Sequence, residues 1–204
     1  MGVIRILIER RLTLSIKDLI NTAYAAFSPD FSDASTDVIA FIGERLDGYC
    51  RDKGYSAAEV DAVVGSGRWW GIAFVPITLD AVRAFAALPE APALAAANKR
   101  ISNILKKAGD VKVGPDPKLF IEPVEIALHK AMVDIVPRAD VQFNSGDYTA
   151  SLQTLAALRA PVDAFFEGVM VNADDLAVRA NRLGLLATLH AAMNRVADLS
   201  KLAA

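Results

Sequence analysis

The second half of the chain places its hydrophobic residues at helical spacing. Between Ala91 and Ala108 the apolar residues return every three or four positions, and Gly109 follows them as a helix stop. The same spacing, interrupted by turn residues, predicts four further helices. These cover residues 123 to about 144, with a break or kink near Pro137, then residues 148–159, 162–171 and about 174–199.

The first half carries clear signals where its helices start. Ser15 is followed three positions later by Asp18, and Ser56 by Glu59, and such pairs cap the first turn of a helix. Helices are predicted over residues 3–12, 15–27, 36–53 and 56–64, with another from residue 78. In the third of these, the helical period directs four apolar residues inward: Val38, Phe41, Ile42 and Tyr49.

Residues 65–76 have no helical period. This glycine-rich stretch contains Trp69 and Trp70, which either form an exposed platform for stacking nucleobases or cover core surface in a connector between domains. We favour the connector, because tryptophan more often covers a core than stands in solvent. Since Val, Ile and Thr form no alternating runs, we expect an all-α fold, a helical bundle of two packed helical subdomains spanning residues 1–76 and 77–204.

Composition narrows the class of protein. The chain has 204 residues, of which 53% are hydrophobic and 23% charged, and its formal net charge is −2, which is typical of a soluble globular protein. No segment approaches the roughly 20 apolar residues that span a bilayer. The single cysteine, Cys50, fits a reducing compartment, so we expect a cytoplasmic protein without a membrane partner. Nucleic-acid binding would have to come from a local basic patch.

Residue patterns that carry chemistry are missing. The sequence has no phosphate-binding glycine loop and no His-Glu-x-x-His zinc motif, and His129 and His190 have no metal-ligand partner at helical spacing. Cys50 lacks the context of a nucleophile. Asp174 and Asp175 open a helix, where the helix dipole already favours acidic residues. We therefore expect no catalytic residue, no metal and no cofactor in this chain.

The predicted helix over residues 91–108 has the strongest binding signal. At about 100° per residue, its polar residues lie opposite its apolar side. They are four cations and an amide: Lys99, Arg100, Asn103, Lys106 and Lys107. Such a face suits RNA or DNA phosphates. An ordinary solvated face is the other interpretation, because lysines in the last turn also complement the helix dipole.

Two features near the C-terminus have ordinary structural interpretations. Arg182 falls among apolar positions of its predicted helix, so we expect a partly buried ion pair with Asp163, Asp174 or Asp175 in preference to an RNA contact. The adjacent pair Phe165 and Phe166 is expected in the core more than on a stacking surface.

Several segments resemble the β subunit of bacterial glycyl–tRNA synthetases. Residues 95–105 are similar to that family's AAANKRxxNIL, and residues 158–166 to its LRxPVDxFF. The tail, which includes residues 179–183, also resembles the DALR anticodon-binding domain shared with arginyl–tRNA synthetases. Residues 2–7 resemble an LGVIRI segment near the end of the family's HD-like helical region. The family's β subunit is several times longer than this chain, and residues 67–78 do not match its pattern.

The resemblance implies a role within a larger enzyme. That enzyme is an α2β2 assembly that joins glycine to tRNA(Gly) at the expense of ATP, with its activation site in the α subunit. Residues 1–76 would be the end of the HD-like region with the connector, and residues 77–204 the domain that binds the anticodon arm, with no role for DNA. By position, the first-rank RNA contacts would be Asn98, Lys99, Arg100, Asn103, Lys106 and Lys107. The second-rank contacts would be Arg159, Arg179 and Arg182.

Two other functions compete with tRNA binding. The chain could be a helical scaffold that docks on other parts of the synthetase while its basic face stays solvated. It could also be a remnant of a metal-dependent HD hydrolase, but no His-Asp dipeptide is present. Salt dependence separates tRNA binding from scaffold docking, because phosphate-driven binding weakens steeply as salt rises and apolar docking does not.

Overall fold

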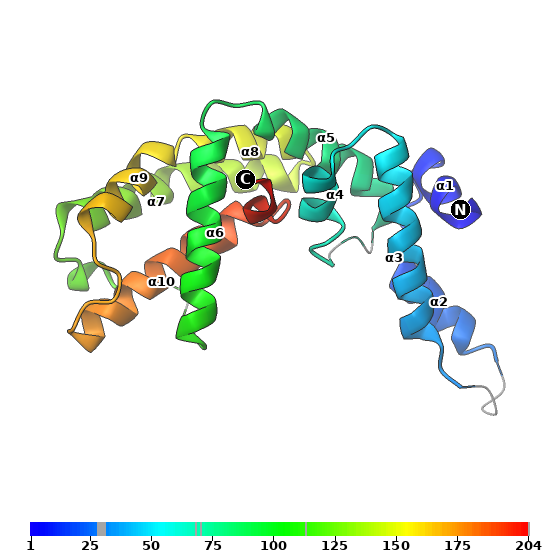
Figure 1. The fold of residues 1–204 in the computed structure, drawn as a ribbon, viewed down its shortest axis with the longest axis horizontal. Coiled ribbons are helices and arrows are strands. Elements are labelled where there is room, and N and C mark those ends of the chain that lie inside the picture. The colour runs from blue at the N-terminus through cyan, green and yellow to red at the C-terminus, as the bar shows by residue number, and fades with distance from the viewer. Residues whose placement is uncertain (28–31, 68, 70, 113, 204) are drawn as a thin grey trace. The chain divides into compact units, whose positions relative to one another are not determined.

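A computed structural model describes residues 1–27, 32–67, 69, 71–112 and 114–203 (Figure 1). Over these residues the regular structure consists of α-helices and three short 3-10 segments, with no strand. The expected all-α class is confirmed. The chain divides into two compact units, Met1–Asp80 and Ala81–Ala204, called unit 1 and unit 2 below.

Two helices of unit 1 begin at the predicted caps. Its helices are α1 (Gly2–Glu9), α2 (Ile16–Tyr24), α3 (Ser35–Asp52) and α4 (Ala57–Val63), followed by the 3-10 segment Ile72–Phe74 and by α5 (Val75–Ala86), inside which the unit ends. The Ser15 side chain accepts a hydrogen bond from the Asp18 backbone N–H, and Ser56 and Glu59 form a complete capping box. Helix α5 begins at Val75, earlier than predicted.

The core of unit 1 lies under the second half of α3. Leu46 and Cys50 are buried there, where α3 packs against α4. Val38 and Phe41, predicted to point inward, are 40% and 52% exposed. That prediction was wrong, because Val38 lines an opening between α2 and α3, and Phe41 is covered only in part, by the Arg45 guanidinium 5.0 Å from its ring centre.

Trp69 is a core residue of unit 1. Its side chain is buried, and a Cβ added at Gly43 of α3 would lie 2.9 Å from its ring, so Gly43 makes room for the indole. The expectation that the tryptophans cover core surface is therefore confirmed for Trp69. Trp70 lies outside the described residues.

Unit 2 contains the remaining helices. They are α6 (Ala91–Ala108), α7 (Pro123–Asn144), α8 (Tyr148–Ala156), α9 (Arg159–Gly168) and α10 (Leu176–Met193), with the 3-10 segments Pro117–Leu119 and η3 (Leu199–Leu202). Helix α7 continues through Pro137, so the chain does not break there, and a kink at this proline stays a prediction. Helix α10 ends before residue 199, because the chain turns at Asn194, whose side-chain oxygen accepts a hydrogen bond from the Leu199 backbone N–H.

Helix α6 is packed into unit 2 along one side. It contacts α10, η3 and α9, and Figure 1 shows it crossing α10. Helix α7 packs against α8, α9 and α10. The largest buried side chains come from all of these helices and include Leu94, Ile101, Leu128, Leu152, Phe165 and Leu185. This packing holds α6 in place while leaving its other side in solvent.

Among the described helices, none is by itself both long and apolar enough to cross a membrane. One bent pair, Ile72–Ala86 with Ala91–Ala108, meets the length and composition requirement only when the two are taken together.

Candidate nucleic-acid interface

Helix α6 presents a basic face to solvent. We call this set of exposed residues the basic face: Lys99, Arg100, Asn103, Lys106 and Lys107. On the opposite side Leu94, Ala95 and Ile101 are buried. No described carboxylate forms an ion pair with Lys99, Lys106 or Lys107, so these ammonium groups are available to an anionic partner.

Asn98 does not belong to the basic face. Its side chain is fully buried, and its amide forms a reciprocal pair with Asn194, the residue that follows α10, with N–O distances of 2.8 and 3.0 Å. Asn98 follows Leu94 by one helical turn and therefore lies on the buried side. Its assignment as an RNA contact is corrected to an anchor of α6.

Further hydrogen bonds extend this anchor. Ser102 Oγ lies 2.8 Å from His190 Nε2, which joins α6 to α10 one turn further along. The Asn194 amide also donates to the His190 carbonyl and accepts from the Leu199 N–H. These bonds fix the rotation of α6 about its axis, and thereby the direction in which the basic face points.

Arg100 lies at one edge of the basic face, against α9. Its guanidinium carbon is 4.2 Å from the centre of the Phe166 ring. Phe165 is buried, as expected, whereas Phe166 is only half-buried, with its ring edge-on to Phe165 at 5.5 Å. A hollow of about 370 Å³ opens beside this pair, and we call it the α6–α9 notch. It is lined by Ala93, Ala96, Ala97, Arg100, Asp163, Phe166 and Glu167.

Arg182 is a structural residue. It is 6% exposed, and its guanidinium donates to both carboxylate oxygens of Glu125, at 3.0 and 3.3 Å. The expected ion pair is confirmed, but its partner is Glu125 and none of the three predicted aspartates. A third donor atom of Arg182 binds the Met170 carbonyl at 2.9 Å. With its donors occupied inside unit 2, Arg182 is corrected from a possible RNA contact to a link between α10, α7 and the segment after α9.

Glu125 is buried yet ionised. Burial raises the pKa of its carboxyl, but hydrogen bonds from Arg182 and from the backbone N–H groups of Glu122 and Ile121 outweigh burial, so the pKa lies below its usual value. The N–H donors are the two residues before α7, and Glu125, in the first turn of the helix, closes a capping box with Glu122. One carboxylate therefore caps α7 and neutralises Arg182.

Asn181, beside Arg182, holds a loop. Its amide accepts from the Asp116 N–H at 2.6 Å and donates to the Asp116 carbonyl at 3.0 Å. Gly184, on the same helix, lies under this loop, because a Cβ there would come within 3.1 Å of the carbonyl oxygens of Lys112 and Gly114. The Asn-Arg pair in this part of the tail therefore serves packing.

The remaining predicted cations are accessible. Arg159 is exposed and lies 3.5 Å from Asp163, which lines the notch, so Arg159 is a neighbour of the notch. Arg179 is half-buried on α10 and forms no ion pair with any described carboxylate.

The described residues contain no group of three or more His, Cys, Asp or Glu side chains placed to hold a metal ion. Burial, with a smaller contribution from Asp47, raises the pKa of the Cys50 thiol to about 11. A thiol with such a pKa is protonated at neutral pH and is a poor nucleophile.

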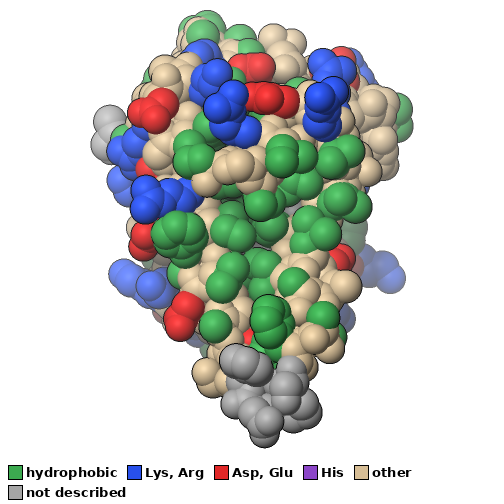
Figure 2. All heavy atoms as spheres, turned by 90° about the vertical axis from the view of Figure 1, so that its right-hand side faces the viewer, with side chains coloured by type: hydrophobic (Ala, Val, Ile, Leu, Met, Phe, Trp, Pro, Cys, Tyr) green, Lys and Arg blue, Asp and Glu red, His purple; other side chains and the backbone are tan. Residues whose placement is uncertain are grey.

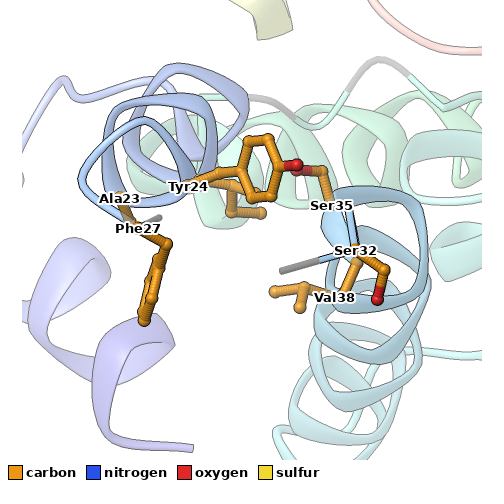
Figure 3. A pocket seen from close by; sticks show the side chains of 8 residues that line it. Ala23, Tyr24, Phe27, Ser32, Ser35 and Val38 are labelled. Atoms are coloured by element: carbon orange, nitrogen blue, oxygen red, sulfur yellow. The ribbon is translucent and has the colours of Figure 1, made fainter. Parts of the chain in front are cut away.

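Unit 1 has a different kind of surface. Figure 2 shows hydrophobic side chains gathered along the middle of one face, with many charged groups toward its upper part and edges. Between α2 and α3 an apolar pocket of about 290 Å³ opens, and we call it the α2–α3 pocket. Figure 3 shows Tyr24 and Phe27, at the end of α2, and Val38, on α3, around this opening. Val3 and Ile6 of α1 are also more than half exposed.

Unit 2 is therefore an all-helical domain in which buried polar pairs fix α6 and leave its cations exposed. Residues 94–201, more than half of the chain, match the DALR anticodon binding domain, and the chain belongs to that family. Residues 1–65 match the glycyl-tRNA synthetase beta subunit family. The two matches fall within unit 2 and unit 1, respectively.

Individual relatives agree with these matches. The chain is 58% identical to the glycine–tRNA ligase beta subunit of Thiobacillus denitrificans over its whole length, which is 29% of that protein. It is 58% identical to the same subunit of an Acidovorax species and 59% identical to that of Polaromonas naphthalenivorans, again over the whole chain and over 28% and 29% of those proteins. The resemblance to glycyl–tRNA synthetase β subunits is confirmed, and the chain spans under a third of the length of these relatives.

Proposed function

We propose that this chain binds the anticodon arm of tRNA(Gly) as part of the β subunit of a glycine–tRNA ligase. The observation that carries the proposal is the basic face, which is exposed, lacks acidic residues and lies within the segment that matches the anticodon-binding family. Lys99, Lys106 and Lys107 contact phosphates, while Arg100 and Asn103 also reach bases. Arg159 and Arg179 remain second-rank contacts.

Binding of this kind is driven by release of counterions from the RNA. Each neutralised phosphate releases condensed cations, so affinity falls as salt rises. A helix whose rotation is fixed before binding loses little further freedom when the complex forms. The buried pairing of Asn98 with Asn194 supports such a preorganised face.

The activity of the whole enzyme enters this proposal through its relatives. They are named as beta subunits of glycine–tRNA ligase, which implies a second kind of subunit. We infer an α2β2 enzyme of the cytoplasm in which the α subunit consumes ATP and charges the tRNA. The present chain contributes RNA binding and neither a catalytic centre nor a cofactor of its own.

The α2–α3 pocket favours a second function for unit 1, namely docking. Its occupant in this proposal is another part of the same β subunit, because the relatives extend well beyond the region matched by this chain. Docking in unit 1 and RNA binding in unit 2 use different surfaces, so both can operate in one polypeptide.

The test is tRNA binding across a salt series. We expect the chain to bind a tRNA(Gly) transcript more tightly than an unrelated tRNA. The double variant Lys99→Ala with Lys106→Ala should bind less tightly, and the slope of log affinity against log salt should shrink by roughly 1.5 to 2.

The matched control removes two exposed lysines elsewhere in unit 2, in Lys118→Ala with Lys130→Ala. It changes the net charge equally and should leave the affinity close to that of the parent chain. Equal weakening by both double variants would show diffuse electrostatic attraction and would refute the basic face as the site. Absence of selective tRNA binding by the folded chain would leave docking as its function.

A further inference from the structure

The α6–α9 notch adjoins the basic face and differs from it in chemistry. We propose that the notch receives one unstacked nucleobase that carries an exocyclic amino group, namely adenine, cytosine or guanine, from the RNA bound on the basic face. This inference rests on the proposed function and assigns the part of the site that reads a base.

The notch offers a stacking surface. Arg100 is exposed and its guanidinium covers the half-buried ring of Phe166 at 4.2 Å. Single-stranded RNA bases stack on aromatic rings and on arginine guanidinium planes. Phe165, buried behind Phe166 and edge-on to it, limits the movement of that ring. The stacking surface therefore exists before the base arrives.

Small side chains leave the space that a base needs. Ala93, Ala96 and Ala97 line the notch from α6, seven, four and three residues before Arg100, respectively, which places them on the same side of the helix. The opening of about 370 Å³ falls within the range of small-molecule pockets, and a nucleobase is smaller than most of their ligands. A larger side chain at Ala96 or Ala97 would occupy this space.

The acidic residues of the notch select the kind of group that enters. Asp163 and Glu167 are carboxylates, which repel phosphate and accept hydrogen bonds from N–H groups. Glu167 is exposed and forms no ion pair with a described residue, whereas Asp163 shares its charge with Arg159. Carboxylates in proteins pair with the amino group of cytosine in this way. Uracil has no amino group, and its one ring N–H lies between two carbonyl oxygens that the carboxylates would repel.

The basic face and the notch together match the course of one RNA strand. Lys107 lies seven residues beyond Arg100 on the same side of α6, about 10 Å along the axis, with Asn103 between them. A backbone that follows Asn103 and Lys107 can turn one base sideways over Arg100 into the notch. Phosphate binding and base reading then use adjacent parts of one helix.

The test uses three conservative variants in the full chain. Arg100→Lys keeps the charge and removes the planar group, and Phe166→Leu removes the ring. Each is expected to lower affinity for tRNA(Gly) by about 5- to 100-fold, with an unchanged salt slope. Glu167→Gln should bind anticodon-loop transcripts that carry uracil at the read position more tightly, compared with its binding of the unaltered transcript. The preference for the unaltered transcript over the uracil transcript should fall by about 5-fold or more.

A second arginine–phenylalanine stack in unit 2 supplies the control. Arg195 lies over the Phe143 ring at 4.4 Å, and neither residue lines the notch. Arg195→Lys and Phe143→Leu should leave tRNA affinity unchanged. If the notch variants bind as the parent does while Lys99→Ala with Lys106→Ala still weakens binding, the notch proposal is overturned and the proposed function stands.

If the parent chain fails to bind tRNA selectively, the proposed function fails first and the notch proposal fails with it. Thermal unfolding of each variant shows whether Phe166→Leu has lost its fold. In that case Arg100→Lys and Glu167→Gln, both at exposed positions, decide the outcome.

Discussion

The two units of this chain stabilise themselves in different ways. Unit 2 buries polar groups in pairs, such as Arg182 with Glu125 and Asn98 with Asn194. Unit 1 is the shorter unit, yet it carries most of the exposed large hydrophobic residues that the structure describes, among them Phe27 at 62% and Ile6 at 56%. Unit 2 therefore resembles a self-contained domain, whereas unit 1 exposes an apolar surface that is suited to a protein partner.

This difference fits the two functions proposed for the chain. A rigid basic face loses little freedom when it binds RNA, and buried polar pairs supply that rigidity. A face that binds protein by apolar contact needs exposed hydrophobic groups, which a self-contained domain avoids. The variants below test how far this division holds, beginning with the largest expected effect.

Removing Arg182 should destabilise unit 2 most. Arg182→Ala leaves the Glu125 carboxylate buried without its cation, and the loss of such a partner costs about 3–5 kcal/mol. Arg51→Ala breaks an exposed pair in unit 1, with Asp47, and should change stability little. Trp69 is buried in unit 1, so its fluorescence follows that unit while far-UV circular dichroism follows both. Equal effects of the two substitutions in urea unfolding would contradict the comparison.

Substitutions at two asparagines of α6 should affect different properties, stability at Asn98 and tRNA binding at Asn103. Asn98→Ala leaves one N–H of the buried Asn194 amide without its acceptor and should lower the free energy of unfolding of unit 2 by about 1–3 kcal/mol. Asn103→Ala, on the exposed side, should leave stability within about 0.5 kcal/mol of the parent and weaken tRNA binding. Denaturant titrations and tRNA affinity for the same two proteins check both halves of this prediction.

Acid should lower the free energy of unfolding of unit 2. Because the native pKa of Glu125 is lowered, its contribution to stability is present above the unfolded-state pKa, near 4.5, and is lost as the pH falls through the native value. Glu125→Gln should therefore be less stable than the parent at pH 7, with a difference that narrows below about pH 4. Unfolding free energies at several pH values measure this, and a constant difference across the range would show that Glu125 is not the titrating group.

The apolar surface of unit 1 should respond in binding more than in stability. Val38→Asp places a charge in the α2–α3 pocket, and the 40% exposure of Val38 predicts a change in stability of less than about 1 kcal/mol. Association with the remainder of a β subunit, supplied in trans, should weaken by about tenfold. Val133→Asp, on an exposed position of α7, is the matched control and should bind that remainder normally.

The sequence predicts well what depends on near neighbours in the chain. The caps at Ser15 and Ser56 and the exposed lysines of α6 follow from spacing over a few residues, and the structure confirms them. The burial of Val38 and Phe41 was predicted wrongly for a physical reason. A helical period shows which residues share a side, but whether another element covers that side depends on tertiary packing.

The same limit applies to the polar partners. Arg182 pairs with Glu125, which is 57 residues away, and no local pattern connects them. Asn98 lies in the same stretch as the exposed cations. However, it follows Leu94 by one helical turn, so helical geometry alone could have predicted its burial. The half-burial of Phe166 and the notch beside it depend on the approach of α9 to α6.

The amide pair between Asn98 and Asn194 has a consequence for experiments. Side-chain amides do not ionise in water and do not attract counterions. The amide pair that attaches α6 is therefore uncharged at every pH at which the protein is folded. Changes of ionic strength then act on the cations of the helix and not on this link. The salt dependence of tRNA affinity therefore reports the number of phosphate contacts, because the amide pair that holds α6 does not respond to salt.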